Sequence, residues 1–217
     1  MKITRISILW LLIIVYLVLV SGFISEKQAV QIINTIDINI TDGEKTHFID
    51  TEDIKEMMDE SRVKILGERV ANIKLKTIEE NLKQHQIIKM AEVYLTERGT
   101  LHVDIKQRNP FVRIFNNHGQ SYYLDEEGNI LPVVKSFSPH VLIVNGHINE
   151  PFNPLIIKNI KKFRYDSLSR QQRCIYDIFN LASFMNNDEF WKSQIVQVYV
   201  NQKYEFELIP RVGSHII

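Results

Sequence analysis

The chain has 217 residues, and its 26 Lys and Arg residues balance its 26 Asp and Glu residues. With no overall excess of either sign, nothing in the charge favours a nucleic-acid partner. The length allows one large domain or two small ones. The hydrophobic fraction of 45% is ordinary for a globular protein, but the apolar residues are concentrated near the N-terminus.

No charged residue occurs between Arg5 and Glu26. Residues 6–24, at about 1.5 Å per residue, would form a helix of roughly 28 Å, close to the thickness of a bilayer core. We therefore predict a transmembrane anchor that runs from Ile6 to Ile24 and includes Trp10 and Tyr16. A cleaved signal peptide is the alternative, but its apolar core is usually about 7–15 residues and precedes a small-residue cleavage site. The sequence Gly22-Phe23-Ile24-Ser25 is a poor site of that kind.

The positive charges that flank this apolar stretch predict its orientation in the membrane. Lys2 and Arg5 precede the apolar stretch, whereas Lys27 alone follows it closely. The positive-inside rule then leaves residues 1–5 in the cytoplasm and sends the remainder across the membrane. Cys174 is the only cysteine and cannot form an intramolecular disulfide.

Residues 25–34 read as a juxtamembrane linker, helical over 26–33, and a small module follows at 35–107. Residues 36–40 alternate apolar and polar side chains, which predicts a strand. A helix is expected at about 51–60, and a second begins at Thr77, which forms a capping box with Glu80. Strands are predicted at 88–96 and 100–106, joined by a turn at Gly99. The expected order is strand, helix, helix, strand, strand, an α+β arrangement.

Pro110 marks the start of a different region, predicted to cover residues 108–217. Short apolar runs at 111–115, 121–124, 129–131 and 141–144 predict strands separated by turns. Residues 169–185 have helical spacing, and two further strands are expected at 193–200 and 204–209. This region is therefore predicted to be a β-rich domain of mostly antiparallel strands with one helix.

Few residues suggest catalysis or metal binding. Asp37, Asn39 and Asp42 fail the register of a calcium loop, and Asp125-Glu126-Glu127 fits a solvated turn better than a metal or acid–base site. The histidines are too dispersed for a metal-ligand pattern. No nucleophile elbow, phosphate-binding loop or zinc-protease pair is present. We therefore expect a protein that is not an enzyme, with no cofactor, metal or small-molecule substrate.

The region around residues 104–132 carries a more specific pattern. Arg108 and Pro110 end one strand, and a Tyr-Tyr-Leu-Asp-x-x-Gly-x-x-Leu-Pro sequence follows. Together with the anchor and the two-part layout, this resembles the FtsQ/DivIB cell-division family, in the form seen in Bacteroidetes, and residues 35–107 resemble its POTRA domain. The residues that carry the motif are Arg108, Pro110, Tyr122, Tyr123, Leu124, Asp125, Gly128, Leu131 and Pro132.

The resemblance implies a divisome scaffold at the septum that joins small bitopic partners like FtsL and FtsB with septal peptidoglycan synthesis. It assigns no individual partner-binding residue. Family members usually extend further past a segment like residues 208–213, so the β domain is expected to be incomplete at its C-terminal end. Two other classes stay open: a POTRA-bearing assembly or secretion accessory, and a membrane-anchored sensor or envelope hydrolase with a polar pocket.

Overall fold

The computed structural model describes residues 10–18, 32–41, 46–60, 65–96, 98–150, 153, 156–162 and 169–213. The chain divides into two compact units. The first comprises Met1–Ile40, Thr51–Leu82 and Ala91–Ile105, and the second comprises Thr41–Asp50, Lys83–Met90 and Lys106–Ile217.

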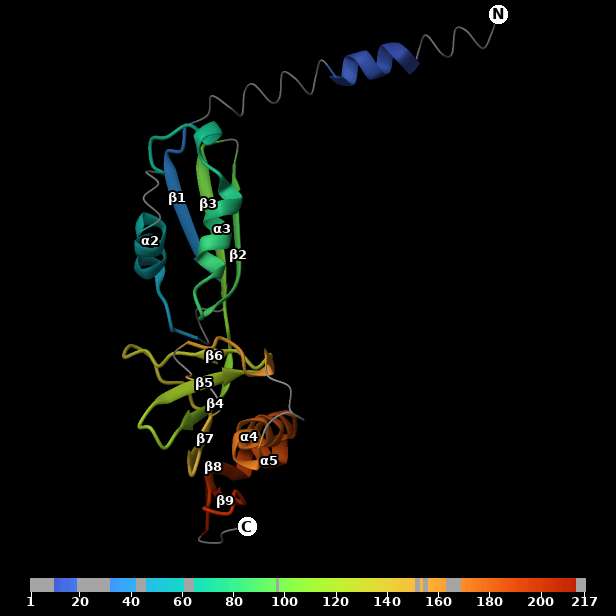
Figure 1. The fold of residues 1–217 in the computed structure, drawn as a ribbon. Helices are drawn as coiled ribbons and strands as arrows, with labels where there is room; N and C mark the ends of the chain where they lie inside the picture. Colours follow the sequence, from blue (N-terminus) through green and yellow to red (C-terminus); the bar gives the residue numbers. More distant parts are fainter. Residues whose placement is uncertain are drawn as a thin grey trace, which may run out of the picture. The chain divides into compact units, whose positions relative to one another are not determined.

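The first unit is built around a three-stranded sheet in the order β1-β3-β2, with β1 parallel to β3. Figure 1 shows two helices, α2 and α3, alongside these strands. The elements in chain order are β1 (Thr35–Ile40), α2 (Thr51–Glu60), the 3-10 turn η1 (Val70–Asn72), α3 (Leu75–Lys83), β2 (Ile88–Leu95) and β3 (Thr100–Gln107). This is the order predicted from the sequence.

Alternation of apolar residues explains why this sheet has one buried face. Leu101, Val103 and Ile105 of β3 are fully buried, as their period of two predicts. The helices contribute buried residues at helical spacing, including Ile54 with Met58 in α2 and Ile78 with Leu82 in α3. Gly99 has a φ of +80°, so the turn before β3 uses the conformation expected there.

Two expectations for this region are wrong in detail. Helix α3 begins at Leu75, so Thr77 lies inside the helix and does not cap it. The Thr77 N–H already bonds to the Lys74 carbonyl at 2.9 Å, which places the helix start before Thr77. The predicted juxtamembrane helix does not reach its expected end, because Ile32 forms a β-bridge with Arg69; residues 26–31 lie outside the described residues.

The second unit contains a six-stranded sheet in the order β6-β5-β4-β7-β8-β9. Three pairings are antiparallel, but β4–β7 and β7–β8 are parallel. The sheet is thus more mixed than the sequence analysis expected, because longer connections carry the chain back before β7 and β8. Its elements are β4 (Pro110–Phe115), β5 (Ser121–Asp125), β6 (Ile130–Leu131), β7 (Leu142–Gly146), η2 (Ile160–Lys162), α4 (Arg170–Asn187), α5 (Glu189–Gln194), β8 (Ile195–Val200) and β9 (Phe206–Pro210).

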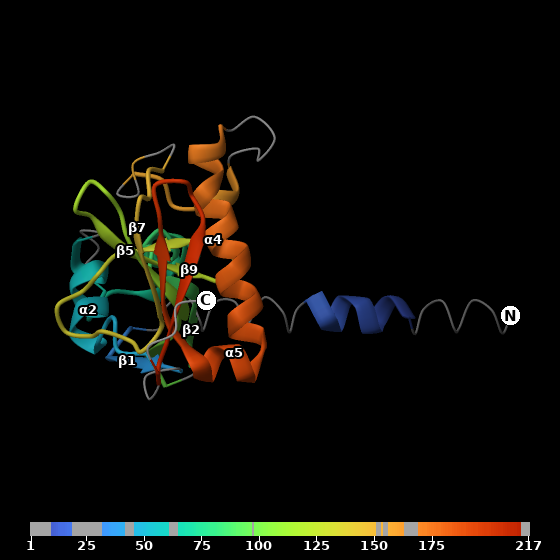
Figure 2. The same cartoon turned by 90° about the horizontal axis from the view of Figure 1, so that it is seen from below.

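The core of the second unit lies between the sheet and α4, which runs along one side of the strands in Figure 2. The sheet contributes residues such as Ile114, Val144 and Val198, and α4 contributes residues such as Ile175 and Ile178. These residues are almost completely buried. Burial of this apolar surface is the main force that holds the unit together.

Helix α5 was not predicted. Asp188 caps it by accepting hydrogen bonds from the N–H groups of Phe190 and Trp191. Residues 193–194, expected to start a strand, are therefore helical. Tyr204, expected in the last strand, has a φ of +61° and belongs to the turn before β9.

Residues 10–18 form a short helix whose large apolar side chains, from Trp10 to Val18, are 43–65% exposed. Among the described residues, no helix has both the length and the apolar character needed to cross a membrane. The ends of the predicted anchor, Ile6 and Ile24, lie outside the described residues.

Candidate functional site

The turn between β5 and β6 is organised by the carboxylate of Asp125. Its Oδ1 accepts hydrogen bonds from the backbone N–H groups of Glu127 at 3.0 Å and Asn129 at 2.8 Å. This is the local bonding by which Asp favours turns. Gly128 completes the turn with a φ of +81°, and an added Cβ would lie 3.1 Å from Cγ1 of Ile160. The sequence around Asp125 therefore specifies the turn by itself.

Arg108 brings a charge to this turn from the end of β3. Its Nη1 donates to Oδ2 of Asp125 at 2.9 Å and to Oε2 of Glu127 at 2.9 Å. The Arg108 side chain is 18% exposed and the Asp125 side chain 6% exposed. At such burial each charge depends on the other, because an unpaired buried charge is strongly unfavourable.

Lys89 of β2 adds a second cation. Its Nζ lies 2.7 Å from Oε1 of Glu127. The hydrogen bond from Lys89, followed by that from Arg108, lowers the pKa of Glu127 from 4.5 to about 2. The same contact with Glu127 raises the pKa of Lys89 above 10.5. We call Arg108, Asp125, Glu127, Lys89 and Asn129 the Arg108 cluster.

Gln107 holds another segment of the second unit. Its buried Oε1 accepts from the N–H groups of Phe48 at 3.1 Å and Ile49 at 3.2 Å, and its Nε2 donates to the Thr46 carbonyl at 2.8 Å. One amide thus satisfies three backbone groups that would otherwise be buried without partners. The Phe48 ring packs edge-on against Tyr123, with 5.8 Å between ring centroids.

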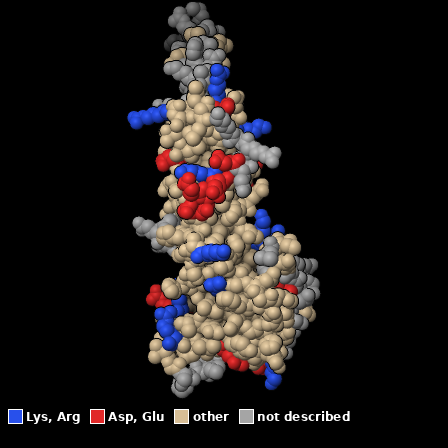
Figure 3. Space-filling model, turned by 90° about the vertical axis from the view of Figure 1, so that its left-hand side faces the viewer, with Lys and Arg blue, Asp and Glu red and all other residues tan. Residues whose placement is uncertain are grey.

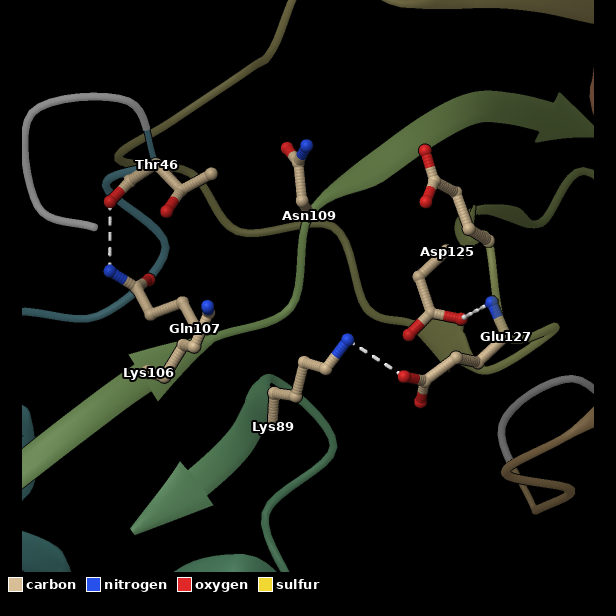
Figure 4. Close-up of a pocket in the computed structure, with 8 residues that line it drawn as sticks. Thr46, Lys89, Lys106, Gln107, Asn109, Asp125 and Glu127 are labelled. Carbon is tan, nitrogen blue, oxygen red and sulfur yellow. Dashed lines mark hydrogen bonds and ion pairs between the residues drawn. The ribbon is translucent and has the colours of Figure 1, made fainter. Parts of the chain in front are cut away.

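A pocket of about 310 Å³ lies beside the Arg108 cluster. Figure 4 shows Lys89 reaching toward Glu127 on one side of it and Gln107 toward Thr46 on the other. It is lined by Thr46, Lys89, Lys106, Gln107, Asn109, Asp125, Glu126 and Glu127.

Glu127 does not have the pKa that a general acid of the envelope hydrolase considered above would need. A general acid needs a carboxyl group whose pKa is raised toward neutrality, whereas the pKa of Glu127 is lowered to about 2. No Ser, Cys or His is among the lining residues. In the described part of the chain, no group of three or more His, Cys, Asp or Glu residues is placed to hold a metal ion.

Two other features of the structure have a structural explanation. Cys174 lies on the buried side of α4, in the core, and its burial raises the pKa of the thiol to about 12. Aspartates and glutamates gather in one patch of Figure 3, on the side where α2 lies in Figure 1. Helix α2 carries Glu52, Asp53, Glu56 and Asp59. An acidic solvated helix face accounts for this patch.

The two edges of the six-stranded sheet differ. At β6, the Ile130 N–H donates to the Lys158 carbonyl at 2.9 Å, so that short edge is covered. At β9, the structure describes pairing with β8 only. The Asn201 N–H donates to the Glu205 carbonyl, so these two residues form a hydrogen-bonded pair. Hydrogen-bonded and non-hydrogen-bonded pairs alternate along antiparallel strands, which puts Phe206 and Leu208 in non-hydrogen-bonded positions. Their main-chain N–H and C=O groups therefore point away from β8. An edge of this kind can pair with a strand of another chain.

Comparison with protein-family models shows which family the chain belongs to. A family model described as FtsQ/DivIB, C-terminal related, matches residues 109–217, half of the chain. The chain belongs to the FtsQ/DivIB family. A POTRA-like domain model matches residues 31–106. No curated protein sequence matches the chain at a significant level.

The structure of this FtsQ/DivIB chain brings several motif residues together. Arg108 contacts Asp125, and Pro110 opposes Asp125 in the β4–β5 register. The sequence interpretation of Asp125 as part of a solvated loop is wrong, because it is buried in its turn and bonded to Arg108. The other motif residues lie in or beside β5 and β6: Tyr122, Leu124 and Leu131 are buried, Tyr123 lies under Phe48, Gly128 forms the turn, and Pro132 follows β6.

Sequence reasoning missed Gln107 and Lys89. Gln107 continues the buried alternation of Leu101, Val103 and Ile105, so its burial was predictable from the strand period. Lys89 gives no such signal, because its partner Glu127 is distant in the sequence. Of the predicted anchor residues, Trp10 and Tyr16 lie in the exposed helix of residues 10–18.

Proposed function

We propose that this protein is a non-catalytic scaffold of the bacterial divisome. It joins small bitopic partners of the FtsL and FtsB type with septal peptidoglycan synthesis. The observation that carries the proposal is membership of the FtsQ/DivIB family through residues 109–217. The Arg108 cluster is consistent with it, because the carboxylates of Asp125 and Glu127 are already engaged by cations.

The proposed anchor is residues 6–24, with residues 1–5 in the cytoplasm, a linker at 25–34, a POTRA domain at 35–107 and a β domain at 108–217 outside the inner membrane. The helix of residues 10–18 supports this, since its apolar side chains are exposed. Contiguous apolar surface of this kind is unfavourable in water and marks contact with lipid or protein. The anchor confines encounters with bitopic partners to the plane of the membrane.

The proposed contact is strand addition at β9. A partner strand would bond to the outward N–H and C=O groups of Phe206 and Leu208, and its side chains would add specificity. This mechanism needs no catalytic residue.

The first experiment follows a fluorescent fusion of the full-length protein during depletion of the native copy. We expect enrichment at the septum and filamentous cells on depletion. An even distribution around the envelope, with normal division after depletion, would contradict the scaffold function.

The second experiment tests the edge. The Leu208→Pro variant removes one outward N–H from β9, and we expect co-purification of the bitopic partners to fall. Because Leu208 also packs partly against the core, thermal unfolding of the variant is the control. Undiminished co-purification by a folded variant would exclude β9 as the contact.

A further inference from the structure

The side of the six-stranded sheet that faces away from α4 carries a second recognition feature. Val112 and Ile114 of β4 belong to the core with α4, so the alternating residues Arg113 and Phe115 point the other way. We call this surface the open face and define it by Arg113, Phe115, Ile143, Gln197 and Ile209.

The strand register aligns most of these residues in one row. Arg113 is paired with Ile143, Ile143 with Gln197, and Gln197 with Ile209. Residues paired across strands project to the same side of a sheet. The row therefore crosses the sheet from β4 to the edge strand β9.

The open face leaves apolar side chains in water. Phe115 is 37% exposed and Ile143 is 39% exposed. The sheet surface next to the open face, at Tyr123, is covered instead: Tyr123 and Phe48 are buried against each other, and Phe48 packs on Phe137 with 5.1 Å between ring centroids. Exposed apolar side chains beside a fixed polar group are typical of interaction surfaces.

Arg113 is held in place at the β4 end of this surface. Its Cζ lies 4.8 Å from the Phe115 ring centroid and 5.2 Å from that of Tyr123. Its Nε donates to Oγ of Ser121 at 3.0 Å, and its Nη1 to Oγ of Ser138 at 3.4 Å. Two aromatic rings and two hydroxyl groups thus fix the guanidinium before any partner binds.

None of the carboxylates that the structure describes forms an ion pair with Arg113. A guanidinium has five N–H donors and binds a carboxylate best at two points. The two hydroxyl contacts leave donors for such a two-point contact. A cation that is already positioned loses little conformational entropy on binding, so its charge favours an acidic partner.

We propose that the open face binds an acidic segment of the bitopic partner that pairs with β9, with a carboxylate at Arg113 and an apolar side chain over Phe115 and Ile143. This inference rests on the proposed function, from which it takes the partner. Neighbouring strands are about 4.8 Å apart, so the distance across the sheet from β9 to β4 is roughly 14 Å. About four or five extended residues span that distance. The acidic residue is therefore expected within roughly ten residues of the β9-pairing segment.

The test measures binding of defined peptides to the full-length protein in nanodiscs. The probes are synthetic fluorescent peptides that cover the extracytoplasmic parts of the FtsB-like and FtsL-like proteins from the same genome. We expect Arg113→Glu to weaken binding about tenfold or more and Arg113→Gln to weaken it several-fold. Lys192→Glu makes the same charge change on α5, and we expect its affinity to stay within about twofold of the unmodified protein.

A charge exchange makes the test specific. An Asp→Arg or Glu→Arg change at the responsible peptide position is expected to weaken binding to the unmodified protein and to restore binding to Arg113→Glu. If Arg113→Glu does not fold, Arg113→Gln and a scan of the peptide's acidic residues against the unmodified protein still decide the matter.

The outcomes separate the two proposals. If Leu208→Pro abolishes binding while both Arg113 variants bind as the unmodified protein does, the open-face inference is wrong and the scaffold proposal stands. If no peptide binds the unmodified protein, both are overturned. A peptide scan with no acidic position that affects affinity would also overturn the open-face contact.

Discussion

The guanidinium of Arg108 donates to the carboxylate of Asp125 over 2.9 Å, although seventeen positions separate the two residues. Asp125 also accepts the backbone hydrogen bonds that shape the turn after β5. One buried carboxylate thus joins the end of β3 to the β5–β6 turn. This relationship explains why the motif spaces its arginine and aspartate on either side of a strand pair.

Replacing Arg108 tests the importance of this pair. We expect Arg108→Met to reduce the free energy of unfolding by about 2–3 kcal/mol, because Asp125 would keep its charge without a cation. Urea denaturation measures the effect. Lys55→Met is the control, since Lys55 pairs with Glu52 at the exposed surface, and we expect it to cost less than about 0.5 kcal/mol. Equal effects of the two variants would show that the Arg108–Asp125 contact does not stabilise the fold.

The lowered pKa of Glu127 predicts a dependence of stability on pH. Its pKa is about 2 in the folded protein against 4.5 ordinarily, so its contribution is fully present above pH 4.5. That contribution is lost as the pH falls from about 4.5 through about 2. The difference in stability between the native protein and Glu127→Gln should therefore shrink over that range in acid denaturation series.

The Lys89→Met variant serves as the companion to that measurement. The Lys89 hydrogen bond is the largest cause of the shift, so its loss should raise the pKa of Glu127 toward the ordinary value. Titration of the Glu127 carboxyl carbon by NMR follows this directly. A native midpoint near 4.5 in the unmodified protein would refute the ion-pair geometry.

Gly146 closes β7 against β8 with a φ of +110°, and an added Cβ would lie 2.2 Å from the Val200 carbonyl oxygen. We expect Gly146→Ala to destabilise the protein by about 2–4 kcal/mol, through backbone strain and a steric clash. Gly119→Ala is the matched control, since its φ is +73° but nothing lies within 4 Å of the added atom. We expect a cost of about 1 kcal/mol there. Thermal unfolding distinguishes the two, and similar losses would argue against the close approach of β7 and β8.

Cys174 should be unreactive in the folded state. Its burial raises the pKa of the thiol to about 12, and the thiolate is the reactive form. Iodoacetamide at about pH 8 is expected to label the protein only after denaturant is added. Rapid labelling without denaturant would mean that α4 opens readily or packs differently.

Sequence patterns predicted the elements whose signals are local. The alternation in β3, the turn at Gly99 and the helical spacing of α4 each depend on residues that are close in the chain. The sequence analysis placed the start of α3 too late and did not predict α5. Backbone hydrogen bonds decide where α3 begins, and a single capping residue decides that α5 forms. The residue motif was also readable, and it led to the family that the comparison shows.

What the sequence alone determined is the family, the element order of the first unit and the local turn that Asp125 and Gly128 build. Only the tertiary structure decided that Asp125 is buried against Arg108, that Lys89 reaches Glu127, and that Arg113 lies between two aromatic rings. These contacts join residues from different strands, and β4 and β7 pair in parallel across a long connection. A residue's own neighbours in the chain fix its backbone preference, whereas burial and charge partners depend on which strands the whole chain places side by side.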